Sequence, residues 1–120
     1  VGALGGRLDQ TLGNLSLLTD PALAGLDLRV DDGVDEVFFS RQQAQIHGCI
    51  GDIVSLIPWH GDVTIIRTEG LRWSLQNETL FAHQTRGISN KMLAENAQVE
   101  IENGLLLIIH TRKERASHQV

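Results

Sequence analysis

The sequence predicts a mainly β protein: an antiparallel β-jellyroll or sandwich of repeated hairpins, preceded by a short N-terminal helical or irregular arm. Four stretches share one pattern, in which alternating small or apolar positions lead into a three-residue turn and apolar character then resumes. From Leu26 to His110, no stretch of ten or more residues keeps a helical period. The chain holds three Phe, two Trp and no Tyr, so an aliphatic core of thin β layers is expected.

The predicted turns use residue types that accept a positive φ or bond to their own backbone. The four are Asp31-Asp32-Gly33, Cys49-Ile50-Gly51, Gln76-Asn77-Glu78 and Glu102-Asn103-Gly104. Another is expected at Pro58-Trp59-His60-Gly61. Because a lone hairpin cannot bury its apolar face, the repeat predicts that each hairpin is one layer of a larger sheet assembly.

The length of 120 residues predicts one domain. We expect an N-terminal arm at 1–25, a β-jellyroll-like domain at 26–111 and a charged tail at 112–120. The arm has leucines at a helix-like spacing, at Leu4, Leu8, Leu12 and Leu15. Val63–Ile66 and Leu105–Ile109 are continuous apolar runs, which predict strands covered on both faces.

Composition excludes some classes of function. The net charge of −5 disfavours binding to nucleic acid, which needs a basic surface. The single cysteine, Cys49, cannot form an internal disulfide, and no apolar run is long enough to span a bilayer. The chain starts at Val1 without a methionine, which fits a membrane anchor or signal peptide removed upstream.

No motif in the sequence indicates catalysis, a metal site or a cofactor. There is no Gly-x-Ser-x-Gly elbow, and Cys49 is better explained as a structural thiol than as a nucleophile. The histidines lack the spacing of a zinc site; they are His47, His60, His83, His110 and His118. The acidic residues are spread over the turns without a close pair. The prediction is a protein that is not an enzyme.

What remains is a surface for binding. The alternating pattern places a set of apolar residues on one face: Ile46, Leu71, Trp73, Leu75, Ala97, Val99 and Ile101. This stripe is either an ordinary packed core or, if the sheet stays partly open, an apolar groove for acyl chains. The pattern alone leaves both interpretations open.

Three segments carry a resemblance to a known family. The run 67–80 (RTEGLRWSLQNETL) resembles the recurring repeat of the lipopolysaccharide-transport proteins of the LptC and LptA (OstA) type. The run 90–101 (NKMLAENAQVEI) resembles the next repeat, and Asp32-Gly33 followed by 37–44 (VFFSRQQA) resembles the entry to the LptC domain. The resemblance covers about residues 26 to 110.

This resemblance implies a twisted, open β-jellyroll in the periplasm, in which the seven residues of the stripe hold the acyl chains of lipid or lipopolysaccharide. It also implies that sheet edges pair with sister proteins, and that a membrane anchor upstream of Val1 attaches the protein to the inner membrane. The expected function is therefore lipid binding or lipid transfer.

Two other resemblances stay open. The run 99–108 (VEIENGLLLI) resembles a strand hairpin of α-crystallin-type small heat-shock chaperones. A set of glycines with Pro58 and Trp73 resembles an OB-fold of the NfeD type, which would serve as a protein-assembly module; the glycines are Gly48-x-x-Gly51, Gly61 and Gly70.

Overall fold

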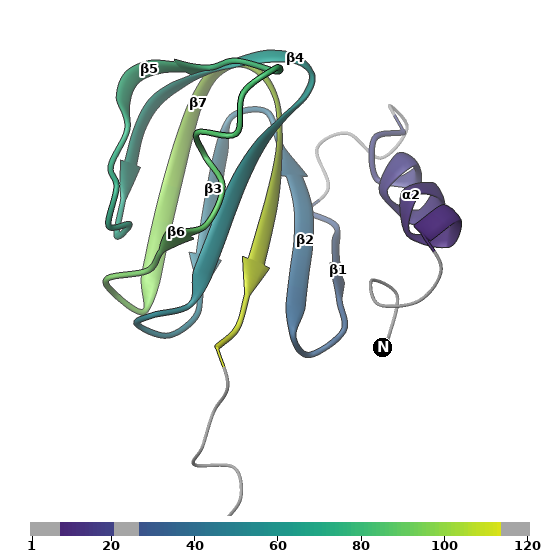
Figure 1. Ribbon diagram of the computed structural model, residues 1–120, viewed down its shortest axis with the longest axis horizontal. Helices are drawn as coiled ribbons and strands as arrows, with labels where there is room; N and C mark the ends of the chain where they lie inside the picture. Colours follow the sequence, from purple (N-terminus) through teal and green to yellow (C-terminus); the bar gives the residue numbers. More distant parts are fainter. Residues whose placement is uncertain (1–7, 21–26, 114–120) are drawn as a thin grey trace, which may run out of the picture.

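The computed structural model describes residues 8–20 and 27–113, which form one helix and seven strands (Figure 1). The elements are α2 (Leu8–Leu17), β1 (Arg29–Asp31), β2 (Asp35–Ser40), β3 (Gln43–His47), β4 (Ile53–Glu69), β5 (Gln76–Leu80), β6 (Asn90–Lys91) and β7 (Asn96–Thr111). The prediction of a mainly β, antiparallel fold with little helix is confirmed. Leu4, most of the predicted tail and part of the predicted arm lie outside the described residues.

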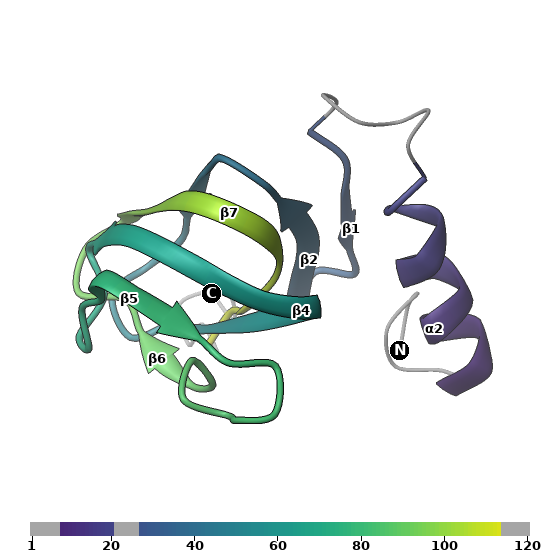
Figure 2. The same ribbon diagram turned by 90° about the horizontal axis from the view of Figure 1, so that it is seen from above.

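Strand β7 is the centre of the sheet. The strand order is β1-β2-β7-β4-β5, with β3 also paired to β7 and β6 paired to β4. On one side of β7, one part of the strand pairs with β2 and another part pairs with β3. Strand β4 pairs antiparallel with β7 along most of the length of β7. Both long strands bend, so that the sheet curls over on itself and encloses a core (Figure 2).

The bends shift the alternation of buried side chains by one residue. Before the bend of β7, the core-facing residues have odd numbers, and after it they have even numbers: Ala97, Val99 and Ile101, then Leu106 and Ile108. Strand β4 shows the reverse change: Val54 and Leu56, then Val63 and Ile65. Because side chains alternate strictly along a regular strand, such a change needs an irregularity in the backbone.

That irregularity lies at residues with positive φ. In β4, His60 has φ 65° and Gly61 has φ 147°, and the register with β7 shifts between Trp59 and Thr64. In β7, Gly104 has φ 100°, and a Cβ at this position would lie 2.7 Å from the Asp62 carbonyl oxygen. The glycine is therefore required both by its backbone conformation and by the close approach of β4.

Three of the predicted turns are corrected here. Residues 102–104 and 58–61 were expected to reverse the chain, but they lie within β7 and β4, where they bend a continuous strand. Residues 76–78 were also expected to form a turn, but they begin strand β5, which pairs with β4. Residues that accept positive φ serve a strand bend as well as a hairpin, so the local pattern does not separate the two.

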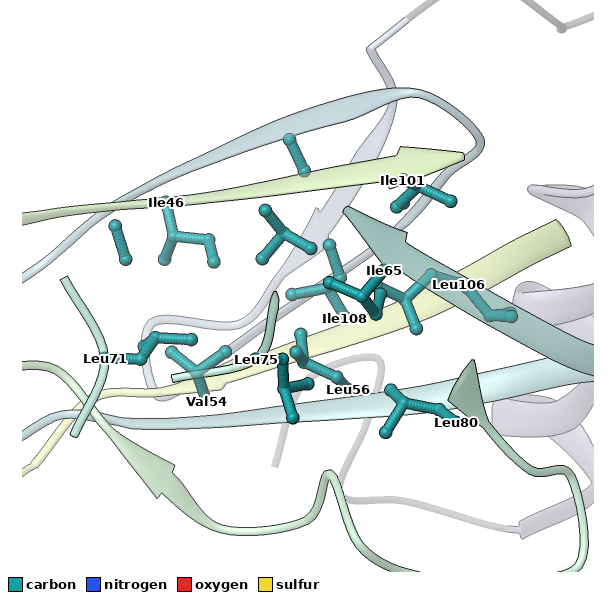
Figure 3. Packing of buried hydrophobic residues seen from close by; sticks show 14 of the residues in the cluster. Ile46, Val54, Leu56, Ile65, Leu71, Leu75, Leu80, Ile101, Leu106 and Ile108 are labelled. Carbon is teal, nitrogen blue, oxygen red and sulfur yellow. The ribbon is translucent and has the colours of Figure 1, made fainter. Parts of the chain in front are cut away.

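The aliphatic core lies between the two halves of the sheet (Figure 3). A second apolar cluster covers the opposite face of β2 and β7, where Leu15 of α2 packs with Val37 and Leu107. The run Leu105–Ile109 is thus covered on both faces, as predicted. The same prediction is wrong for Val63–Ile66, in which only Val63 and Ile65 are buried.

Candidate functional site

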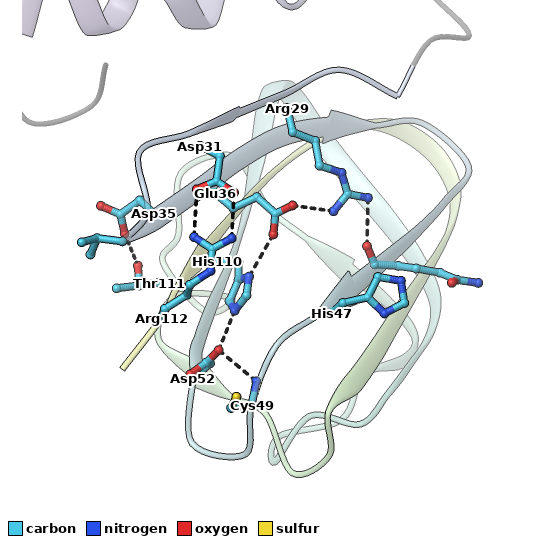
Figure 4. A network of polar contacts seen from close by, with 12 residues as sticks. Arg29, Asp31, Asp35, Glu36, His47, Cys49, Asp52, His110, Thr111 and Arg112 are labelled. Carbon is cyan, nitrogen blue, oxygen red and sulfur yellow. Dashed lines mark hydrogen bonds and ion pairs between the residues drawn. The ribbon is translucent and has the colours of Figure 1, made fainter. Parts of the chain in front are cut away.

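A buried polar cluster closes one end of the core. His110 is the next core-facing residue of β7 after Leu106 and Ile108, and its side chain is fully buried. Its Nδ1 lies 2.9 Å from Glu36 Oε1, and its Nε2 lies 2.8 Å from Asp52 Oδ2 (Figure 4). Both ring nitrogens of the imidazole therefore lie within hydrogen-bond distance of a carboxylate oxygen.

Asp52 is fully buried and is bound on all sides by donors. Besides His110, the Cys49 backbone N–H donates to Oδ2 at 3.0 Å and the Lys113 backbone N–H donates to Oδ1 at 3.0 Å. A Cβ on Gly48 would lie 2.6 Å from both Asp52 Oδ2 and His110 Nε2, so only glycine leaves room for this pair. The loop between β3 and β4 is thereby built around the Asp52 carboxylate.

Glu36 connects the cluster to a partly buried cation, Arg29. Its Oε2 accepts a hydrogen bond from Arg29 Nη1 at 2.9 Å, and Arg29 also stacks on the Phe38 ring at 3.8 Å. Burial alone raises the pKa of the Glu36 carboxyl, but the hydrogen bonds from His110 and Arg29 outweigh it and hold that pKa below its usual value.

The lowered pKa of Glu36 predicts a loss of stability in acid. The folded-state pKa lies below the unfolded value near 4.5, so Glu36 stabilises the fold above that pH and this contribution is lost as the pH falls through the folded pKa. We expect the free energy of unfolding, measured by urea titration, to fall between about pH 6 and about pH 3. Glu36→Gln should flatten this decline, whereas Gln at the exposed Glu102 should not. Equal slopes for all three proteins would contradict the assignment.

A second feature is an exposed indole held on a rigid backbone. Trp73 is 54% exposed, although its neighbours Leu71 and Leu75 are buried. Asn90 fixes the backbone of Trp73 from both sides: Trp73 N–H donates to Asn90 Oδ1 at 3.0 Å, and Asn90 Nδ2 donates to the Trp73 carbonyl oxygen at 2.7 Å. Asn90 is itself 6% exposed, so a buried amide determines where the tryptophan emerges.

Two chain segments make up what we call the Trp73 surface: residues 70–73 and 90–93. Arg72 N–H donates to the Lys91 carbonyl oxygen and Leu93 N–H donates to that of Gly70, both at 2.8 Å. Leu93 is 56% exposed, and the Arg72 guanidinium lies 4.9 Å from the centre of the Trp73 ring. The Arg72 guanidinium and the Trp73 indole therefore form a cation–π pair on this surface.

The residues predicted to line a groove are separated by the structure. Six lie in the packed core cluster: Ile46, Leu71, Leu75, Ala97, Val99 and Ile101. Figure 3 labels Ile46, Leu71, Leu75 and Ile101 among the other core side chains. Trp73 is the member of the set that is more than half exposed. It therefore lies outside the core, although its position in the alternating sequence pattern is the same as that of Leu71 and Leu75. The reason is that residues 71–75 are not a strand and do not alternate as one.

Sequence reasoning missed the polar cluster and Asn90. The histidines were interpreted as scattered, but His110 is joined to Glu36 and Asp52, which lie 74 and 58 residues away. No local spacing indicates contacts of that range. Among the residues that the structure describes, no group of three or more His, Cys, Asp or Glu side chains is arranged to hold a metal ion. His118 lies outside those residues.

Comparison with known proteins decides the family. The family model for the thiamin pyrophosphokinase vitamin B1 binding domain matches residues 40–106, which is more than half of the chain. The chain belongs to this family. The matched range includes both segments of the Trp73 surface.

Curated relatives of this vitamin B1 binding domain carry the name of the complete enzyme. Thiamine pyrophosphokinase 1 of Arabidopsis thaliana is 31% identical over 121 residues, which cover 98% of this chain and 45% of the relative. Thiamine pyrophosphokinase 2 of the same plant is 31% identical over 115 residues, covering 93% and 43%. The chain thus spans less than half the length of these relatives.

Solved structures show the same fold. The thiamine pyrophosphokinase of Bacillus subtilis superposes with a TM-score of 0.81 at 23% identity, covering 93% of this chain and 54% of that one. A probable thiamine pyrophosphokinase of Staphylococcus saprophyticus has a TM-score of 0.65 at 30% identity, covering 94% and 52%. The arrangement of β strands described above is therefore shared with these enzymes.

These findings correct the functional expectations. The resemblance to lipopolysaccharide-transport proteins is wrong, and so are the lipid, lipopolysaccharide and sister-protein partners that followed from it. The chaperone and NfeD-like alternatives are contradicted too. The prediction that the protein is not an enzyme is contradicted, because the curated relatives are named thiamine pyrophosphokinases.

The expected location is corrected as well. The prediction of a periplasmic, anchored protein depended on the lipopolysaccharide-transport resemblance, and it falls with that resemblance. Within residues 8–20 and 27–113, the structure has no helix with the length and apolar character to cross a membrane.

The sequence repeat is too unspecific to identify a family, which explains the wrong resemblance to lipopolysaccharide-transport proteins. An alternating strand, an aromatic residue and a turn are shared by many antiparallel β proteins, so they indicate the fold class and not the family.

Proposed function

We propose that this chain binds thiamine, and that the Trp73 surface forms part of the binding site. The observation that carries the proposal is the exposed, rigidly held indole of Trp73, inside the segment that matches a vitamin B1 binding domain. Thiamine has a permanently charged thiazolium ring and a flat aminopyrimidine ring. Either ring can stack on an indole, and the charged ring gains a cation–π attraction in addition.

The neighbouring groups support the same ligand. Leu93 adds exposed apolar area, and the Asn90 amide fixes the backbone of the aromatic residue. The Arg72 guanidinium shows that the Trp73 ring face can be approached by a planar cation. A rigid aromatic anchor lowers the entropy that must be lost when a small ligand binds.

We further propose that the activity is transfer of a pyrophosphoryl group to thiamine, as the names of the relatives state for those proteins. In this proposal the chain supplies the thiamine-binding part, because it matches the binding domain and spans less than half of each relative. The division into an arm at 1–25, a domain at 26–111 and a tail at 112–120, and the jellyroll form of that domain, are kept as proposals of the same kind.

Calorimetric titration with thiamine tests the binding site. We expect Trp73→Ala to weaken binding about 30-fold, which corresponds to a cation–π contact of about 2 kcal/mol. Trp73→Phe should retain part of the affinity, because a phenyl ring still offers a π face. A thiamine analogue with an uncharged ring in place of the thiazolium should show a smaller difference between the wild type and Trp73→Ala.

Trp59 offers a matched control. It lies on β4 and packs against Phe39 in the second apolar cluster, with ring centroids 5.4 Å apart, outside the Trp73 surface. Trp59→Phe should therefore leave thiamine affinity unchanged. Equal affinity in the wild type and Trp73→Ala would remove this surface from the site, and absence of thiamine binding to the wild type would overturn the proposed function.

A further inference from the structure

We propose that the buried Asp52–His110 pair positions the Trp73 surface: it fixes segment 90–93, and through Asn90 it sets the orientation of Trp73 for its ligand. This inference rests on the proposed function as far as the ligand is concerned. Asp52 and His110 are positioning residues here, since neither side chain is exposed to solvent.

The first step runs from the Asp52 side chain to its own backbone. His110 Nε2, Cys49 N–H and Lys113 N–H all contact the carboxylate, at 2.8, 3.0 and 3.0 Å. The Asp52 N–H also donates to the Cys49 carbonyl oxygen at 3.0 Å. With both its carboxylate oxygens and its N–H engaged, the residue has little freedom to rotate, and its carbonyl group is held in one direction.

The second step joins this backbone to segment 90–93. Met92 N–H donates to the Asp52 carbonyl oxygen at 2.8 Å, and Gly51 N–H donates to the Met92 carbonyl oxygen at 2.9 Å. Met92 is 1% exposed and forms an antiparallel bridge with Leu71. The loop before β4 therefore holds Met92 by two opposed backbone hydrogen bonds.

The third step leads from Met92 to the indole. Asn90 precedes Met92 by two residues and pairs with Val54 of β4, so both ends of the short segment are fixed. Its side-chain oxygen accepts from Trp73 N–H, and its Nδ2 donates to the Trp73 carbonyl oxygen. A displacement of Asp52 would thus reach Trp73 through a continuous series of hydrogen bonds, of which the Asn90 side chain makes the last two.

The free-energy balance favours positioning over simple stabilisation. Burying charged and polar side chains is costly, and well-packed apolar side chains of similar volume are often at least as stabilising. A buried carboxylate with several hydrogen bonds is held in one orientation, which an apolar contact does not achieve. Gly48 adds to the argument, because its lack of a side chain is what leaves space for the pair.

The test uses Trp73 as the single fluorescent reporter, in a Trp59→Phe background, because the chain has two tryptophans. Asp52→Asn keeps the shape of the side chain but replaces one acceptor oxygen with a donor, so one of the three N–H groups loses its partner. We expect the Trp73 emission to shift to longer wavelength and the dissociation constant for thiamine to rise about tenfold.

Glu36→Gln is the matched control. It makes the same chemical change on the other side of the same imidazole, but Glu36 lies on β2, which does not pair with β6. This variant should lower the melting temperature while leaving the Trp73 emission and the thiamine affinity unchanged. If both variants shift the emission equally, or neither does, Asp52 has only a general structural role and the proposal is wrong.

Two further readouts distinguish failure of the positioning role from failure of thiamine binding and from failure of a variant to fold. If the wild type does not bind thiamine, the proposed function fails, but the emission of Trp73 in the two variants still decides the positioning role. If Asp52→Asn does not fold, amide hydrogen exchange in the unaltered chain decides it. The Met92 and Trp73 amides should exchange as slowly as those of β4, and exchange of Met92 at the rate of an exposed loop would overturn the proposal.

Discussion

Replacing His110 with leucine should lower the free energy of unfolding by about 3–5 kcal/mol, which is the usual cost of leaving a buried charged group without its partner. The leucine would fill most of the imidazole volume, so the expected loss is electrostatic. Asp52 would lose its hydrogen bond from Nε2, and Glu36 would keep only its contact with Arg29. Urea titration at neutral pH, monitored by circular dichroism, measures the change.

A neighbouring surface pair provides the control. Arg112 and Asp31 form a salt bridge at 2.7 Å, with both side chains partly exposed. Arg112→Ala should cost about 1 kcal/mol or less, because solvent screens such pairs. A loss of comparable size in both variants would show that the buried cluster is no more important for stability than the surface pair.

Gly70→Ala should be the second strongly destabilising change, with a loss of about 3 kcal/mol or more. Gly70 has φ 79°, and a Cβ there would lie 2.4 Å from the Asn96 carbonyl oxygen and 3.1 Å from Ala97 Cα. Both atoms belong to the backbone of β7 and cannot move away alone. The Gly70 carbonyl oxygen also accepts from Leu93 N–H, so the Trp73 surface should be disturbed together with the fold.

Gly33→Ala separates the cost of a positive φ from the cost of a steric clash with β7. Gly33 has a similar φ of 92°, but nothing lies within 4 Å of a Cβ at that position. Its cost should therefore be the conformational strain alone, about 1 kcal/mol. Thermal unfolding of both variants measures the difference, and equal losses would show that the close approach of β7 at Gly70 is relieved without cost.

The fold class could be predicted because alternation and turn residues are local properties. The Gly33 turn joins β1 and β2 as expected, and helical spacing of leucines in the arm corresponds to α2. The predicted turns at Gly61 and Gly104 were bends, because two long strands pair with each other through the irregularity. Whether a positive φ reverses a chain or bends it depends on that long-range partner, which the sequence does not display.

The candidate site could be predicted only in part. Trp73 stands out in the sequence, but its exposure depends on the irregular path of residues 71–75, which the alternating pattern misrepresents. The contacts of Asn90 and His110 come from segments brought together by folding. An isolated buried acid or histidine has no local signal, since its partners are set by the packing of other strands.

The central position of β7 has a consequence for the order of folding. Strands β2, β3 and β4 all pair with β7, yet β7 follows every one of them in the sequence. During synthesis, these strands are made before their common partner. Their apolar faces therefore stay exposed to solvent until residues 96–111 have left the ribosome. Closure of the sheet is therefore a late event dominated by distant contacts, and it is the step at which aggregation competes with folding.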